Sequence, residues 1–219
     1  LTVEILRKFE KTNPEYYWTM IEGLISEGQR GRIYRGWEHI TDEFYQLLEG
    51  RPIFGLDFGW SESPMAFGEI KFKNNRAYLR EHIYEAMTLK ELAIKLIILG
   101  VKEDLIIADA AERDSIHKMR TGWKRDELKP EELEKYPQLL RGFNVIPCIK
   151  GPGSVKAGIA KVQEMDIFAT EGSTNIWHEY SEYKWALDKD KNPTDEPAEG
   201  NDHNMDWIRY IIAGRGRQF

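Results

Sequence analysis

The chain has 219 residues, of which 41% are hydrophobic and 31% are charged, and its formal net charge is −6. This composition is typical of a globular protein with one sizeable core, and no apolar run reaches the roughly 20 residues that a membrane span needs. The negative charge disfavours broad, tight binding to nucleic acid, and the single cysteine, Cys148, excludes an internal disulfide and fits a reducing compartment.

The first 50 residues differ from the rest of the chain, because they mix aromatic and charged residues without a clear buried segment. Residues 14–27 favour a helix, and Gly28, Gly31 and Gly36 then interrupt that pattern. The chain also begins with Leu1 and not with methionine. We therefore expect residues 1–50 to be a linker and packing arm within a longer polypeptide.

From residue 53 onward, predicted strands and helices alternate. A short apolar run at 53–58 predicts a buried strand, and the segments 66–72 and 76–83 flank a polar turn and predict a hairpin. Thr88, with Glu91 three residues later, predicts a capped helix that ends near residue 99. The remaining predictions, in order, are a strand at 104–108, a helix at 112–119, a surface excursion at 121–141, a strand at 143–149, a helix at 154–165 capped by Ser154, a helix at 175–182, a polar hairpin or loop at 183–199, and a final helix ending near 213. This order predicts an α/β fold whose mixed sheet is flanked by helices.

Three aspartates lie at the ends of apolar segments that are far apart in the sequence. Asp57 is near the end of the first strand, Asp109 directly follows the strand at 104–108, and Asp206 lies near the start of the last helix. Ligand sites in open α/β sheets collect at the carboxyl ends of strands, and the positive end of a helix favours anions. Carboxylate oxygens favour Mg²⁺ or Mn²⁺ over zinc, so the pattern predicts a site for a hard divalent cation.

Each of these residues also has a purely structural interpretation. Asp57 can simply end its strand, and the spacing of Asp109 and Glu112 fits a capping box. Asp202 is the better N-cap for the last helix. His203 lies one helical turn before the third aspartate, where it can position a water, shuttle a proton or contact phosphate, or serve only as a hydrogen-bonding surface residue.

Basic residues gather in two stretches that follow apolar segments. Residues 140–163 contain four basic residues and no acidic one, and in residues 112–125 five basic residues accompany two acidic ones. A basic rim around an acidic centre suits a phosphodiester held against metal ions. Ordinary solvated surface explains the same charges equally well.

Five segments resemble, in the same order, the nuclease domain of the large terminase subunit of tailed bacteriophages. The likeness extends roughly over 31–215 and is carried by residues 54–59, 108–112, 150–159, 182–185 and 202–210. The resemblance implies a ribonuclease H-like fold with a terminase-type β-hairpin. It also implies metal-ligand roles for Asp57, Asp109 and Asp206, places His203 near the active centre, and makes Lys150, Lys156 and Arg113 candidates for DNA contact.

The same resemblance implies a function, partners and a location. It implies an endonuclease that cuts concatemeric viral double-stranded DNA during genome packaging, with little sequence specificity, by hydrolysis assisted by Mg²⁺ or Mn²⁺, two ions being expected. In the full-length context, the implied partners are the phage portal protein and the small terminase subunit, with no membrane involved. The implied location is the host cytoplasm, transiently at the procapsid portal.

An ATPase motor precedes the nuclease in that family, but the sequence contains no Gly-x-x-x-x-Gly-Lys-Ser/Thr phosphate loop. We therefore expect residues 1–50 to come from the linker after an absent ATPase domain, and residues 51–219 to form the nuclease domain. Two features depart from the family pattern. Trp207 stands where a small residue is expected and predicts crowding of the last helix, and the stretch 121–141 is longer than usual.

Other functions stay open at this point. A nuclease of the same fold, of the resolvase or integrase type, would show metal-dependent cleavage and a preference for four-way junctions. A non-catalytic module that docks on a portal ring or on the small terminase subunit would show no cleavage. An actin-like or sugar-kinase ATPase would need a second glycine-rich phosphate loop, which the sequence lacks.

Overall fold

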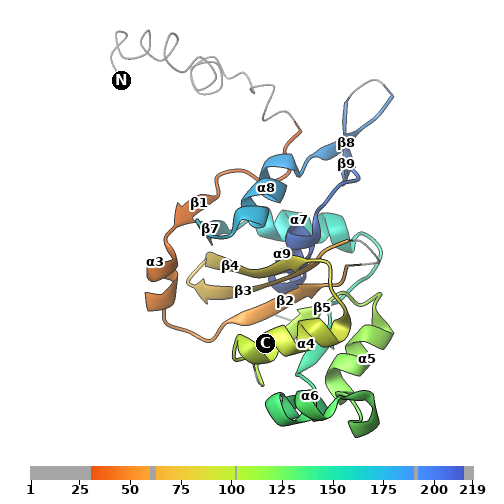
Figure 1. Cartoon of the computed structure of the whole chain (residues 1–219). Helices are drawn as coiled ribbons and strands as arrows, with labels where there is room; N and C mark the ends of the chain where they lie inside the picture. The colour runs from red at the N-terminus through yellow and green to blue at the C-terminus, as the bar shows by residue number, and fades with distance from the viewer. Residues whose placement is uncertain (1–30, 60–62, 102, 190–191, 215–219) are drawn as a thin grey trace, which may run out of the picture. The chain divides into compact units, whose positions relative to one another are not determined.

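The computed structural model of the protein describes residues 31–59, 63–101, 103–189 and 192–214 (Figure 1). The chain divides into two compact units, one of Leu1–Ile33 with Lys184–Ala198 and the other of Tyr34–Tyr183 with Glu199–Phe219. The helix predicted at 14–27 lies outside the described residues. Within the described ranges, no helix has the length and apolar character needed to cross a bilayer.

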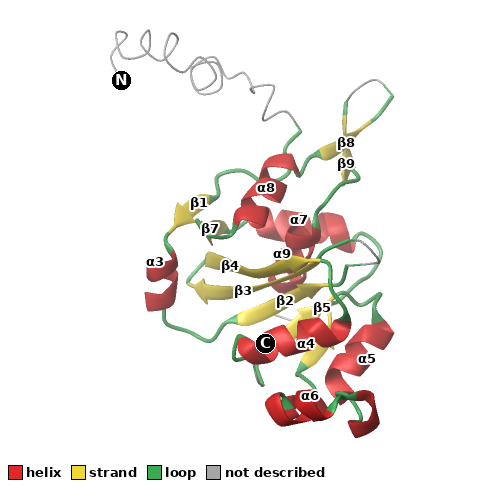
Figure 2. Ribbon diagram, viewed as in Figure 1, coloured by secondary structure: helices red, strands yellow, loops and turns green. Residues whose placement is uncertain are grey.

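The larger unit is built on one mixed sheet of seven strands, in the order β1-β7-β4-β3-β2-β5-β6 (Figure 2). Strand β3 runs antiparallel to both of its neighbours, and the other pairs are parallel. The strands are β1 (Glu38–Ile40), β2 (Ile53–Asp57), β3 (Met65–Lys73), β4 (Arg76–Glu85), β5 (Ile106–Ala108), β6 (Val145–Pro147) and β7 (Asp166–Thr170).

Helices flank this sheet, so the predicted α/β class with a mixed, helix-flanked sheet is confirmed. Thr88 caps α4 and Glu91 completes the capping box, as predicted. By contrast, α7 begins after Gly153, whose φ of 71° is left-handed, and Ser154 is its first residue and not its cap. The helices are α3 (Asp42–Leu47), α4 (Leu89–Ile98), α5 (Arg113–Thr121), α6 (Pro130–Lys135), α7 (Ser154–Gln163), α8 (Thr174–Glu182) and α9 (His203–Gly214), with short 3-10 turns at Arg125–Glu127 and Pro137–Leu140.

One face of the sheet packs against α4 and the segment 121–141. Phe54 and Leu56 of β2 belong to a buried apolar cluster that continues through α4. Trp123, Leu128 and Leu139 belong to the same cluster. The stretch predicted as a surface excursion therefore completes the core below α4, although its charged residues face solvent.

The opposite face of the sheet packs against α9 through Trp207, which is fully buried. Its indole lies over two glycines of the sheet. A Cβ atom at Gly55 would stand 2.6 Å from the indole, and one at Gly68 would stand 2.4 Å from it. The predicted crowding of this helix does not occur, because β2 and β3 lack side chains where the ring lies. The space that Gly55 leaves is thus filled by Trp207.

Two strands at one edge of the sheet, β1 and β7, have no clear signal in the sequence. Strand β1 pairs with β7 in parallel, and β7 pairs in turn with β4. Residues 34–47, which we assigned to the packing arm, thus add a strand and α3 to the larger unit, where Tyr34 and Tyr45 are buried. The domain boundary at residue 50 stays a prediction.

The smaller unit contains the hairpin predicted within 183–199. Strand β8 (Trp185–Leu187) pairs antiparallel with β9 (Pro193–Pro197). The backbone of Arg32 forms an isolated bridge with Lys184, and the Trp185 N–H donates to the Gly31 carbonyl at 2.9 Å. These bonds join the start of the described chain to the base of the hairpin.

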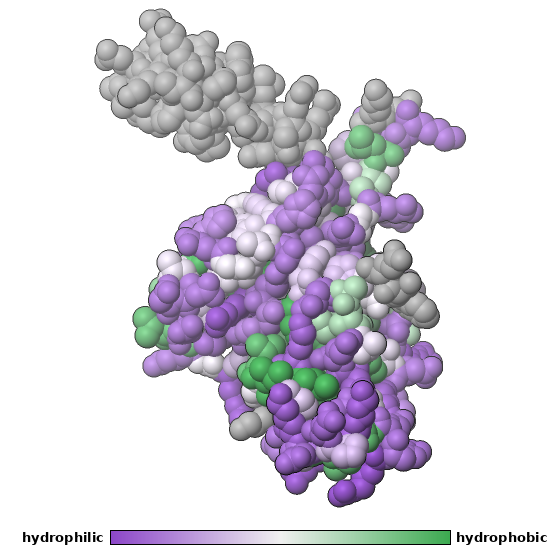
Figure 3. Space-filling model, in the orientation of Figure 1, coloured by the Kyte–Doolittle hydropathy of each residue, from purple (hydrophilic) through white to green (hydrophobic). Residues whose placement is uncertain are grey.

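The face of the molecule in Figure 3 is largely hydrophilic, with hydrophobic residues gathered over the region of α4. Ile98 and Leu99, at the end of that helix, are 67% and 44% exposed. The candidate site residues described next come instead from the opposite side of the sheet, where α9 lies.

Candidate functional site

Two of the predicted aspartates lie at one edge of the sheet because their strands are neighbours. Asp57 is the last residue of β2, and Asp109 directly follows β5. The two strands pair in parallel with Leu56 opposite Ala108, and the Asp109 N–H donates to the Leu56 carbonyl at 3.3 Å. The two carboxylates therefore leave the sheet side by side.

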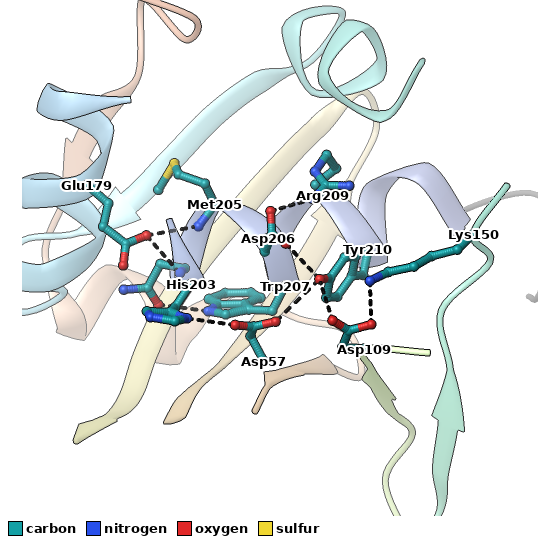
Figure 4. A network of polar contacts seen from close by, with 11 residues as sticks. Asp57, Asp109, Lys150, Glu179, His203, Met205, Asp206, Trp207, Arg209 and Tyr210 are labelled. Atoms are coloured by element: carbon teal, nitrogen blue, oxygen red, sulfur yellow. Dashed lines mark hydrogen bonds and ion pairs between the residues drawn. The ribbon is translucent and has the colours of Figure 1, made fainter. Parts of the chain in front are cut away.

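Helix α9 brings the third aspartate to the same place (Figure 4). Tyr210 lies one turn after Asp206 on this helix, and its hydroxyl oxygen lies 2.7 Å from Asp206 Oδ2. The same oxygen lies 3.3 Å from Asp57 Oδ1 and 3.4 Å from Asp109 Oδ2. One oxygen from each of the three carboxylates thus converges on a single atom.

The second oxygen of each carboxylate is held from outside by a basic side chain. His203 Nδ1 lies 2.8 Å from Asp57 Oδ2, and both residues are largely buried. The Arg209 guanidinium donates to Asp206 Oδ1 from one turn along α9. These contacts orient Asp57 and Asp206 without using the oxygens that face inward.

Asp109 also has one oxygen that faces outward and one that faces the centre. Its Oδ1 accepts from the Ala111 N–H at 2.8 Å and pairs with the Lys150 ammonium, while its Oδ2 faces the centre. The structural alternative, a capping box of Asp109 with Glu112, does not describe the start of α5, whose N-cap is Glu112 itself. Lys150 comes from the loop between β6 and α7, so four separate segments meet at the site.

The site carries excess negative charge in a poorly solvated place. Burial raises the pKa of Asp57, the hydrogen bond from His203 opposes this shift, and Asp206 and Asp109 add to it. The hydrogen bond to Asp57 raises the pKa of His203 against the effect of burial. Burial, together with Asp206 and Asp57, raises the pKa of Asp202 to about 6. A nearby cation would favour the ionised forms of Asp57 and Asp202, whose pKa values are raised in this way.

A buried carboxyl group from α8 caps the helix that carries the site. Glu179, only 1% exposed, accepts at Oε2 from the Asn204 N–H at 2.7 Å and from the Met205 N–H at 3.1 Å. Burial raises its pKa to about 8, against the effect of these hydrogen bonds. Asp202 directly precedes α9, as predicted, and its carbonyl accepts from the Asp206 N–H at 2.8 Å.

Asn204 extends this polar network across the sheet. Its side chain donates to Glu81 on β4 at 3.1 Å and accepts from the Trp207 indole N–H at 2.7 Å. Glu81 also accepts from the Ile176 N–H at 2.9 Å, near the start of α8. The start of α9 is therefore tied to α8 and β4 by hydrogen bonds to buried and partly buried side chains.

Comparison with known proteins points to one group of phage proteins. The large terminase subunit of Bacillus phage SPP1 is 29% identical over 164 residues, which are 72% of this chain and 35% of that protein. The chain therefore spans about a third of the length of the curated relative it matches. No family model matches the chain.

Two solved structures share the fold along most of the chain. The nuclease domain of the SPP1 large terminase, with bound Mn, is 25% identical and matches with a TM-score of 0.59 over 80% of this chain and 92% of that one. The predicted resemblance to large terminase nuclease domains is confirmed. The large terminase of a thermophilic bacteriophage, 19% identical, matches with a TM-score of 0.59 over 98% of this chain and 52% of that one. The fold is accordingly the ribonuclease H-like fold of terminase nuclease domains.

The chemistry of the donors at the centre of this terminase-like fold fits a hard divalent cation. Three carboxylates each present one oxygen to the same point, and no soft ligand lies among them. As the side chains stand, however, no group of three or more histidine, cysteine, aspartate or glutamate side chains in the described ranges is arranged to hold an ion. An ion held by these three oxygens would need the space that the Tyr210 hydroxyl occupies.

The other two predicted contact residues lie outside this group. Lys156 is exposed in the first turn of α7, and Arg113 is the exposed first residue of α5. Among the predicted site residues, the structure thus brings together Asp57, Asp109, Asp206, His203 and Lys150.

Three residues of the site received no role from the sequence, although two of them, Arg209 and Tyr210, lie within the segment 202–210 that carries the family resemblance. Arg209 and Tyr210 follow Asp206 at the helical spacings i+3 and i+4, which place them on its side of α9, so their positions carried a usable signal. Glu179 lies on a different helix, and nothing in its sequence surroundings links it to the start of α9.

Proposed function

We propose that this chain is a divalent-metal-dependent endonuclease that hydrolyses phosphodiester bonds in double-stranded viral DNA during genome packaging. The convergence of one oxygen each from Asp57, Asp109 and Asp206 carries the proposal. The likeness of the chain to the nuclease domain of the SPP1 large terminase, whose solved structure contains Mn, supports the proposal.

In this proposal the three aspartates hold Mg²⁺ or Mn²⁺, as a pair of ions. Such ions, when bound, lower the pKa of a water nucleophile and stabilise the leaving oxygen of the phosphodiester. The inward oxygens of Asp57, Asp109 and Asp206 are the ligands, because the outward oxygens already accept hydrogen bonds.

The basic residues around the aspartates have distinct tasks. His203 fixes Asp57 through Nδ1, which leaves Nε2 to exchange a proton with a water or with the leaving oxygen of the phosphodiester. Arg209 fixes Asp206, and Lys150 adds positive charge beside Asp109, where an incoming phosphate would otherwise meet only carboxylates.

Lys156 and Arg113 extend this positive rim as contacts for the DNA backbone. Contacts with phosphates carry no base information, so cleavage with little sequence specificity follows. In a full-length protein, the portal protein and the small terminase subunit are the partners that this proposal assigns, and the host cytoplasm is the location.

Replacement of a ligand tests the proposal most directly. Asp57→Asn and Asp109→Asn keep the side-chain volume but remove a charged oxygen ligand. We expect each to lower Mn²⁺-dependent cleavage of supercoiled plasmid by roughly 100-fold or more, since even the partners of metal ligands contribute 10–100-fold. The measurement is the initial nicking rate on an agarose gel.

Asp126→Asn is the matched control, because Asp126 is an exposed aspartate in the 3-10 turn Arg125–Glu127. It should cleave at the wild-type rate. Folded Asp57→Asn and Asp109→Asn proteins that still cleave normally would contradict the proposal. No cleavage by the wild type would favour the docking module, and a strong preference for four-way junctions would favour a resolvase.

A further inference from the structure

The hydroxyl group of Tyr210 occupies the point where the three carboxylates meet. No other polar group lies within hydrogen-bond distance of all three in the part of the chain that the structure describes. A cation bound by the same three inward oxygens would need the same space. Tyr210 and the cation of the proposed function are therefore alternative occupants of one position.

The Tyr210 hydroxyl can donate a hydrogen bond to only one of the three carboxylates. A phenol has a single proton to donate, and the shortest contact, 2.7 Å to Asp206, receives it. The oxygens of Asp57 and Asp109, at 3.3 and 3.4 Å, are left facing an oxygen lone pair. A divalent cation would attract all three carboxylates at once, so the hydroxyl is the weaker of the two occupants.

The tyrosine is held in this position by the rest of the site. Its side chain is only 4% exposed. The Lys150 ammonium lies 5.4 Å from the ring centroid, and the Arg209 guanidinium lies 5.2 Å from it. These cations are the ones that hold the outward oxygens of Asp109 and Asp206. The ring is thus part of the same framework as the carboxylates and not a loosely placed neighbour.

We propose that Tyr210 is a positioning residue that fills the centre of the aspartate cluster in the metal-free protein and is displaced from it when a divalent cation binds. This inference rests on the proposed function, and it adds that metal binding has a free-energy cost. The hydrogen bond between Tyr210 and Asp206 must break before the inward oxygens can close around an ion, so the hydroxyl weakens the affinity of the site.

Tyr210→Phe removes the hydroxyl and keeps the ring between its two cations. We expect this variant to bind Mn²⁺ about tenfold more tightly than the wild type, since a hydrogen bond to a charged group no longer competes. Isothermal titration of the whole chain with MnCl₂ alone measures this without DNA or catalysis. Tyr78→Phe is the matched control, because Tyr78 is a buried tyrosine on β4 that stacks on Phe168. It should bind Mn²⁺ as the wild type does.

A spectroscopic measurement on the wild type tests the inference even if Tyr210→Phe does not fold. Saturating Mg²⁺ should change the near-ultraviolet circular dichroism of the wild type, because a buried phenol loses its carboxylate partner. The folded Phe variant should lack this change. Unchanged or weaker Mn²⁺ binding by folded Tyr210→Phe would overturn the inference, as would a wild-type spectrum that is indifferent to saturating Mg²⁺.

These results can be separated from a failure of the proposed function. If the wild type binds no Mn²⁺, or if Asp57→Asn binds it equally well, the aspartate cluster is not the metal site and the proposed function fails. If binding depends on Asp57 but is indifferent to the Tyr210 hydroxyl, the proposed function stands and only the role of Tyr210 is wrong.

Discussion

At the scale of single residues, each aspartate of the site divides its two oxygens between two tasks. One oxygen accepts from a basic partner, and the other points to the common centre. A carboxylate held at one oxygen loses less conformational freedom when the other binds an ion, which is the general advantage of preorganised ligands. The three outer partners are therefore part of the proposed site, although none of them is assigned as a ligand.

Glu179 makes the stability of the protein depend on pH. Its pKa is about 8 in the folded protein and near 4.5 when the chain is unfolded. The folded state then binds the extra proton between these values, so the free energy of unfolding falls as the pH rises from about 5 to about 8. We expect Glu179→Gln, which cannot ionise, to show a flatter fall over this range in urea unfolding without metal.

Other groups with raised pKa values, including Asp57 and Asp202, also make the free energy of unfolding fall as the pH rises. The curves of the wild type and the variant should therefore differ in steepness and not in direction. Glu131→Gln, at an exposed site on α6, should follow the wild-type curve. Parallel curves for the wild type and Glu179→Gln would show that Glu179 is ionised at neutral pH in the folded protein.

Much of the site could be predicted from the sequence, because its aspartates stand at the ends of recognisable segments. Asp57 and Asp109 end or follow apolar strands, and Asp206 and His203 open a helix with an apolar face. The division of oxygens could not be predicted, since it depends on which partner reaches each carboxylate in space. The role of Glu179 is hidden for the same reason: it meets α9 only through tertiary packing.

At the scale of whole elements, the position of α9 is set by one large residue against two very small ones. Trp207 fits over the sheet because β2 and β3 both have glycine beneath it. The ring is also held by its hydrogen bond to Asn204 at 2.7 Å. A helix seated this closely leaves little freedom for Asp206, the neighbouring residue, to move away from the other carboxylates.

A side chain at Gly68 should disturb this contact. Its Cβ would lie 2.4 Å from the Trp207 ring and 2.7 Å from the Arg80 carbonyl. We expect Gly68→Ala to lower the free energy of unfolding by about 1–3 kcal/mol, the usual range for overpacking in a core. Urea unfolding measures the change, and Mn²⁺ affinity should fall with it because α9 is pushed outward.

Gly200→Ala is the control, since a Cβ there would meet nothing within 4 Å. In the double variant with Trp207→Phe, the smaller ring should recover part of the loss, so that the two changes are not additive. If Gly68→Ala unfolds like the wild type, or if the two effects simply add, this pair does not fix the position of the helix.

The elements that could not be predicted from the sequence have weak local patterns. Strand β1 has only three residues, and β7 lies directly after α7 with little room for a separate turn signal. The segment 121–141 reads as surface because charged residues surround its apolar ones. Only tertiary packing shows that Trp123, Leu128 and Leu139 enter the core. The longer hairpin β3–β4 and the capped helix α4, whose local patterns are strong, were predicted with small errors at their ends.

At the scale of the whole molecule, the proposed metal ligands join distant parts of the chain. Asp57 ends β2, Asp109 directly follows β5, and Asp206 comes from α9, the last helix described. An unfolded chain cannot hold these residues together, so ion binding should stabilise the folded state as a whole.

Saturating Mn²⁺ should therefore raise the melting temperature of the wild type. At about 100 times the dissociation constant the gain is about 2.7 kcal/mol, which corresponds to roughly 5–10 °C for a domain of this size. Differential scanning calorimetry measures it, and Asp57→Asn should show little or no shift. An equal shift in that variant would mean that Mn²⁺ binds elsewhere on the protein.

The outer partners of the three carboxylates differ in kind: an imidazole, a guanidinium and an ammonium with a backbone amide. The basic partners bind the outward oxygens of the carboxylates, and the proposed ion would bind the inward ones. Substitutions at positions 150, 203 or 209 can therefore change the reactivity of the proposed site while the three aspartates stay the same. If the proposed nuclease function holds, substitutions at these three positions should change the rate or the pH optimum of cleavage without removing any of the proposed metal ligands.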